Sequence, residues 1–184
     1  MNAVFKREFK SYFSTPIGFI VLAAFYFFLG LFFSLIYQSG SPDISMVIMA
    51  MSTVAVFTMP VLTMRLMSED RRQKVDQALL TAPVKLTGIV LGKFFAALAV
   101  FALGFAPTVI FEIIIASYVS VNVMSYIYAL FGMLLLGSAL IAIGMFISSL
   151  TESSVISAIL TLVINILVLY MSNFASMINV SWIK

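Results

Sequence analysis

Residues 17–37 read IGFIVLAAFYFFLGLFFSLIY, an apolar run without a charged side chain. A helix needs about 20 apolar residues to cross the roughly 30 Å hydrocarbon core of a bilayer, and this run has 21. It is longer than the roughly 7–15 residues typical of the apolar part of a secretory signal peptide, and no clear small-x-small cleavage site follows it. We therefore expect a retained transmembrane helix here rather than a signal peptide.

The rest of the chain repeats this pattern. Further apolar runs of membrane-spanning length lie at about residues 44–64, 94–120, 126–147 and 154–171. The composition agrees, since 63% of residues are hydrophobic and only 9% are charged, whereas soluble domains are about 45–50% apolar and about 25% charged. The sequence predicts an all-α fold, a polytopic membrane helical bundle with about five transmembrane helices in a single domain over residues 1–184.

The N-terminal residues 1–15 show a different periodicity. Apolar side chains recur at spacings of three and four, while most basic ones fall on the other side of a helix: Val4, Phe5, Phe9, Tyr12 and Phe13 against Lys6, Arg7 and Lys10. This pattern is typical of an amphipathic helix at a membrane surface. We expect an interface helix that ends at Pro16.

Basic residues are distributed unevenly along the chain. Nine of the ten Lys and Arg residues precede the first run or lie in residues 65–93. With five spans these regions share one side, and the positive-inside rule makes that side the cytoplasm. The N-terminus and residues 65–93 are thus expected inside, and the tail 172–184 outside. Orientation in the membrane also explains the net charge of +3, so we expect no nucleic-acid partner.

Residue types needed for most catalysis are missing. The sequence has no histidine and no cysteine, which are the commonest general base, metal ligand and reactive nucleophile. The nearest approach to a phosphate-binding loop is residues 88–94, where only three residues separate Gly88 from Gly92 and Phe94 replaces the required Ser or Thr. We expect no catalytic residues, no metal site and no cofactor of the chain's own.

Two polar residues interrupt the later spans. Glu112 follows Lys93 by 19 residues, about 28 Å along a helix, which places it nearer the outer interface than the bilayer midplane. An ionisable group in a span suggests a transport role, and the alternative is a carboxylate near outer water or hydrogen-bonded in the bundle. Pro107 predicts a kink before it. Asn165 is expected to hydrogen-bond between helices.

Residues 68–84 read SEDRRQKVDQALLTAPV and predict a short helix. Ser68 is a suitable N-cap and Pro83 a suitable stop. Val75, Ala78 and Leu79 share one face, with Leu80 beside them. Such an apolar end favours either packing on the membrane surface or docking to a partner.

Two sequence blocks resemble permease subunits of ABC transporters, in the type-2 exporter branch that includes gliding-motility permeases. The first comprises an acidic–basic run at residues 69–72, Leu79-Leu80, Pro83 and Gly92-Lys93. The second is GSALIAIGMFISSLTE at residues 137–152. The chain departs from the family pattern at Lys74-Val75, where Gly-Thr is common. It also resembles a six-span permease that lacks its last span, with 172–184 similar to the segment before it.

The resemblance implies a function in ATP-driven export across a bacterial cell membrane. A separate cytoplasmic ATPase would bind the ATP, and a second permease copy or homologue would complete a dimer in the bilayer. The implied ATPase-docking residues form a coupling helix: Arg71, Arg72, Val75, Asp76, Ala78, Leu79 and Leu80. The competing classes are an ion-coupled secondary transporter that depends on Glu112 and a non-transporting membrane scaffold or immunity protein.

Overall fold

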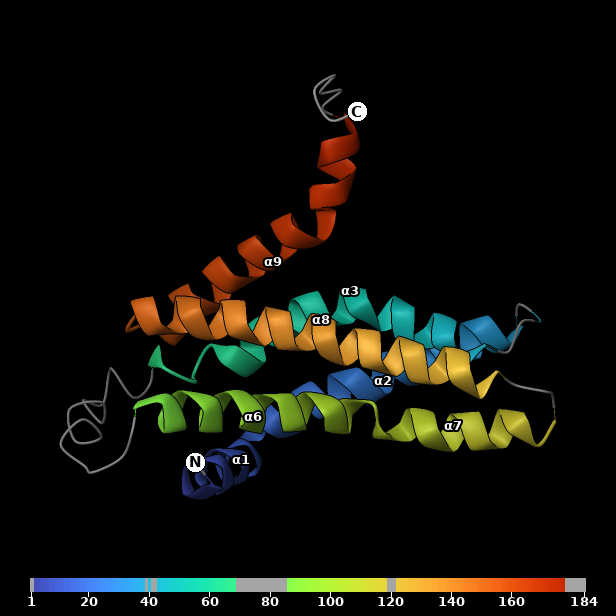
Figure 1. Ribbon diagram of the computed structural model, residues 1–184, viewed down its shortest axis with the longest axis horizontal. Coiled ribbons are helices and arrows are strands. Elements are labelled where there is room, and N and C mark those ends of the chain that lie inside the picture. Colours follow the sequence, from blue (N-terminus) through green and yellow to red (C-terminus); the bar gives the residue numbers. More distant parts are fainter. Residues whose placement is uncertain (1, 39, 41–42, 69–85, 119–121, 178–184) are drawn as a thin grey trace.

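The computed structural model describes residues 2–38, 40, 43–68, 86–118 and 122–177, and its regular elements there are all helices (Figure 1). In chain order the helices are α1 (Asn2–Ser14), α2 (Pro16–Gln38), α3 (Ile44–Thr63), α6 (Leu86–Gly104), α7 (Ala106–Ala116), α8 (Val123–Leu150) and α9 (Ser154–Met177). Five stretches in this part of the chain are long and apolar enough to cross a membrane. The predicted all-α membrane bundle is confirmed.

The third span differs most from the expectation. It was expected to begin after Lys93, but the apolar helical stretch runs over Thr87–Ala116 and so includes Lys93. The span extends past Lys93 because the side chain of this lysine is only 1% exposed and so does not mark the water interface. The span is also broken rather than kinked. α6 ends at Gly104 and α7 restarts at Ala106, because Pro107 has no N–H to continue the hydrogen bonding of α6.

α3 is the central helix of the bundle. It packs against α2, α8 and α9. In its most apolar 18-residue stretch 56% of the residues are buried, against 17% in that of α9. Aromatic rings fill the space between α2 and α6, where the Phe25 ring lies 5.6 Å from both Phe101 and Phe105 in near edge-to-face contact. This tight core fixes the positions of α2, α3, α6 and α8, while α9 is held by fewer contacts.

Two glycines of α8 allow its close approach to the core. A Cβ atom at Gly137 would collide with the Phe101 ring, and one at Gly144 would collide with the Thr63 side chain. These glycines lie seven residues apart, or about two helical turns, and so share one face. By contrast, a Cβ atom at Gly132 would meet nothing within 4 Å.

α1 lies crosswise to the spanning helices at the end of the bundle where α3 ends and α6 begins (Figure 1). Its apolar face packs mainly on α6, with Val4 against Gly92. Phe5, Phe9 and Phe13 form a ladder that continues to Phe19 on α2. The basic side chains of Lys6, Arg7 and Lys10 are exposed. α1 therefore has the two faces that its sequence predicts, but α6 covers a large part of the apolar one.

The glycine contacts give a testable prediction. We expect Gly144→Ala to destabilise the protein by about 1–3 kcal/mol, because overpacking a filled contact displaces its neighbours. Gly132→Ala is the control on the same helix and should leave stability unchanged or slightly higher, because alanine is the better helix former. Thermal unfolding in detergent measures both. Equal melting temperatures for the two variants would contradict the close packing of α8 on α3.

Candidate functional site

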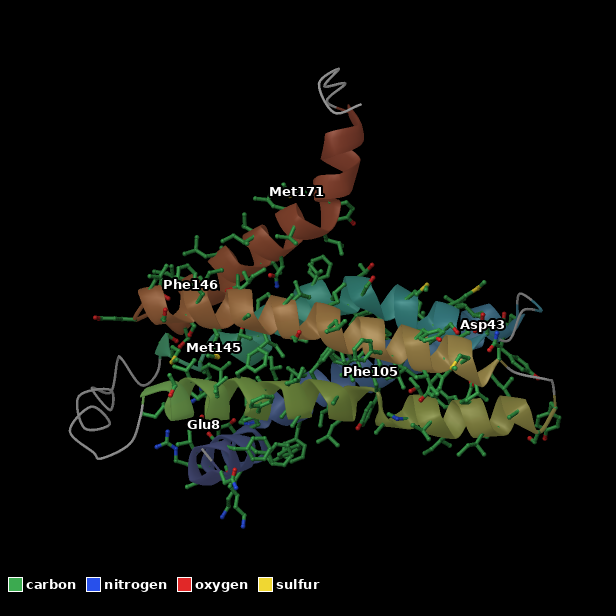
Figure 2. The ribbon with its side chains drawn as sticks, in the orientation of Figure 1. Glu8, Asp43, Phe105, Met145, Phe146 and Met171 are labelled. Carbon is green, nitrogen blue, oxygen red and sulfur yellow. The ribbon has the colours of Figure 1, made fainter. Side chains whose placement is uncertain are left out.

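Polar side chains and one backbone carbonyl, that of Leu66, converge at the end of the bundle that carries α1. We call this cluster the anchoring junction and define it by Glu8, Tyr12, Leu66, Ser68, Lys93 and Ser148. Figure 2 shows Glu8 between α1 and α6, at the end of the molecule opposite Asp43. The cluster includes Leu66 and Ser68, close to the start of the segment 69–85 that lies outside the described residues. It therefore holds the ends of the connection between α3 and α6.

Lys93 is the buried cation of the anchoring junction. Its side chain is 1% exposed, and its ammonium Nζ lies 3.6 Å from Glu8 Oε1. The same nitrogen donates a hydrogen bond to the backbone carbonyl oxygen of Leu66. A buried charge is expensive unless an opposite charge and hydrogen bonds compensate it. Lys93 therefore requires α1, the residues after α3 and the first turns of α6 to stay together.

Glu8 joins this buried pair to the protein surface. Its side chain is 15% exposed, and Oε1 also lies 2.6 Å from Nη2 of Arg7, whose side chain is 50% exposed. Exposed ion pairs add little to stability, commonly below about 1 kcal/mol. The inner contact with Lys93 is thus the one expected to fix α1 in place.

Ser148 ties the end of α8 to the end of α3. Its hydroxyl oxygen accepts hydrogen bonds from the backbone N–H groups of Met67 (3.1 Å) and Ser68 (3.0 Å), and its O–H donates to the Met64 carbonyl (3.1 Å). The Ser68 hydroxyl donates to the same carbonyl and lies 3.3 Å from the hydroxyl of Ser154 at the start of α9. One serine therefore binds the Met64 carbonyl, which the end of α3 leaves without a helical partner, and two backbone N–H groups that follow it.

Tyr12 adds a further tie between α1 and α3. Its phenol O–H donates to the Leu62 carbonyl oxygen at 2.9 Å. Burial, together with the nearby Glu8 carboxylate, raises the pKa of this phenol well above its usual value. Tyr12 consequently keeps its proton, and its role as a donor, throughout the physiological pH range.

The docking residues expected from the sequence lie outside the described part of the chain: Arg71, Arg72, Val75, Asp76, Ala78, Leu79 and Leu80. What the structure does describe is the anchorage on both sides of them. Sequence reasoning missed the pairing of Glu8 with Lys93. A sequence signal was present for Lys93, because the residues at helical spacing from it are all apolar, namely Ile89, Ala96, Ala97 and Val100; the structure buries all four.

The two polar residues of the spans lie apart from the anchoring junction. Glu112 lies in α7 and is 9% exposed. Asn165 lies in α9 and is fully buried, and its amide makes no hydrogen bond to the described residues. Its role as a hydrogen-bonding contact between helices stays a prediction. Within the described residues, no three His, Cys, Asp or Glu side chains are grouped as metal ligands.

The Ser148 contacts predict a specific loss of stability. Ser148→Ala removes one acceptor and one donor, and leaves two backbone N–H groups near the end of α3 without their partner. We expect a cost of about 2–4 kcal/mol in unfolding free energy. Ser138→Ala is the matched control, because Ser138 lies on the same helix and donates to Leu135 within it. Equal thermal stability of the two variants would show that Ser148 does not hold the helix ends together.

A family model described as ABC-2 type transporter matches residues 1–184, and so includes all five spans and the anchoring junction. Neither the curated proteins nor the solved structures contain a match. The family comprises membrane components of ABC transporters, in agreement with the multi-pass helical bundle. The chain therefore belongs to the ABC-2 type transporter family and is a membrane permease of ABC transport.

Proposed function

We propose that this permease is the membrane subunit of an ATP-driven exporter and that a separate cytoplasmic ATPase docks on residues 69–85. The observation that carries the proposal is the anchoring junction. The residues just before this segment are bonded to Ser148 and Lys93, and Lys93 itself lies in the helix that follows it. A partner that moves the segment would therefore move α1, α3, α6 and α8 at their shared end.

The division of labour follows from the sequence. The chain has no phosphate-binding loop at Gly88–Phe94, its nearest approach to one, so ATP would be bound by the partner. Nucleotide can drive a conformational change only if the partner binds the two conformations of the permease with different affinity. A segment that is held at both ends transmits such a difference better than a free loop, because displacement at its middle reaches the spans.

The docking surface we propose is the apolar side of the coupling helix. Val75, Ala78, Leu79 and Leu80 would make the contact, with Arg71, Arg72 and Asp76 at its polar rim. The positive-inside distribution of basic residues supports a cytoplasmic location for this segment and for the N-terminus. The resemblance to gliding-motility permeases supports a bacterial cell membrane and a dimer with a second permease copy or homologue.

The docking proposal is tested by affinity purification from native membranes. The combined variant Leu79→Asp and Leu80→Asp should lower the amount of co-purified ABC ATPase at least about tenfold. The contact would lose the burial of two apolar side chains, and burying two carboxylates in their place costs desolvation free energy. Quantitative mass spectrometry of the purified complex measures this amount.

A control separates docking from a general effect of charge. Gln73→Asp with Gln77→Asp adds the same two negative charges to polar positions of the same segment and should leave the co-purified ATPase unchanged. The thermal stability of both variants checks that the bundle is intact. Undiminished ATPase on a folded Leu79→Asp, Leu80→Asp variant would remove the docking proposal.

A further inference from the structure

Three polar residues form a buried stripe along α9. Ser157, Thr161 and Asn165 follow one another at intervals of four residues, and each is 0% exposed. Residues at this spacing lie on one face of a helix. α9 packs against α3 and α8, so the stripe lies in the seam where α9 meets the bundle.

The stripe is unusual because its polar atoms have no hydrogen-bond partner among the described residues. Ser157 Oγ, Thr161 Oγ1, Asn165 Oδ1 and Asn165 Nδ2 are all buried without a hydrogen bond. Hydroxyls elsewhere in this bundle donate to carbonyls of their own helix, as Thr58 and Thr63 do. A buried polar group without a partner costs about 1–3 kcal/mol. Four such atoms in one stripe therefore favour a hydrogen-bonding partner beyond the described residues.

The stripe continues a row of hydroxyls that starts in the anchoring junction. Ser154 at the first turn of α9 lies against Ser68, oxygen to oxygen, at 3.3 Å. From Ser154 to Asn165 the helix rises about 16 Å, which reaches roughly halfway through a hydrocarbon core about 30 Å thick. Beyond Asn165 the positions that extend the same face are Val168 and Leu169. The polar row therefore has an entrance at the junction and an apolar end near the middle of the membrane.

α9 is also the span that can most readily move to admit a small molecule. Only 17% of the residues in its most apolar 18-residue stretch are buried, the lowest share among the five candidate spans of the described chain. In Figure 1 it starts beside the end of α8 and leans away from the bundle. Separating α9 slightly from α3 therefore disrupts little apolar contact.

We propose that the seam of Ser157, Thr161 and Asn165 binds a short file of water molecules that enters from the anchoring junction. Every group in the stripe is neutral, which favours water over an ion. A buried water molecule typically makes about three hydrogen bonds, as donor and as acceptor, and so satisfies hydroxyls and an amide alike. The wet seam lets α9 shift against α3 by exchanging water-mediated bonds. This inference does not depend on the docking of an ATPase.

The sequence contains no cysteine, so single thiols can report on water in the seam. Ser157→Cys, Thr161→Cys and Asn165→Cys are compared with Ile159→Cys, Val163→Cys and Leu167→Cys, whose native side chains are 57%, 48% and 54% exposed on the outer face of α9. The full chain is placed in phospholipid nanodiscs and treated with a small charged methanethiosulfonate reagent. The thiolate attacks this reagent, forming a mixed disulfide and displacing methanesulfinate, and the thiolate forms in water and not in lipid or in a dry protein interior.

We expect the stripe thiols to react at least about tenfold faster than the outer-face thiols, because only the stripe thiols ionise. Equal rates, or no reaction at the stripe, would overturn the proposal. Asn165→Leu provides a second readout that needs no labelling. A hydrated seam predicts an unchanged or lower melting temperature, because the asparagine loses bonds to water. A raised melting temperature would show that the amide is dry and without partners, and would also overturn the proposal.

Discussion

The buried ammonium group of Lys93 is the constraint on which the arrangement of this bundle end depends. An unpaired charge cannot remain in a membrane protein interior at acceptable cost. Lys93 is compensated by Glu8 of α1 and by the Leu66 carbonyl beyond α3. The same contacts draw the crosswise helix onto α6 and place the end of α3 beside the start of α6. The interface helix is therefore part of the bundle and not only an anchor on its surface.

The connection between α3 and α6 leaves the bundle from this fixed end. Ser148 adds the end of α8, and Ser154 adds the start of α9. Helices far apart in sequence thus meet beside the segment on which we propose that an ATPase docks. The close packing of α8 at Gly137 and Gly144 makes most of the bundle stiff, whereas α9 has few apolar contacts and unsatisfied polar ones. A displacement at the anchoring junction would therefore mainly move α9 relative to α3 and α8.

The fold could largely be predicted from the sequence because each membrane span is a continuous apolar run, such as residues 17–37, that can be recognised without knowing its tertiary contacts. The start of the third span is not predictable from the sequence alone, because Lys93 carries a charge and its partner Glu8 is remote in sequence. Only tertiary structure shows that the two meet. The burial of Asn165 was predictable from its position in an apolar run, but its missing hydrogen bonds depend on how α9 packs. The docking helix at Leu79 and Leu80 stays a prediction, since those residues lie outside the described chain.

The central claim is that the Glu8–Lys93 contact holds α1 to the rest of the bundle, and a double-mutant cycle tests it most directly. The unfolding free energies of Glu8→Gln, Lys93→Met and the combined variant give the interaction energy of the pair. We expect each single change to be destabilising and the combined variant to lose at least about 1 kcal/mol less than their sum. The exposed Arg7–Glu8 pair, treated in the same way, should show a coupling below about 1 kcal/mol. Costs of Glu8→Gln and Lys93→Met that add to within about 0.5 kcal/mol would contradict the account.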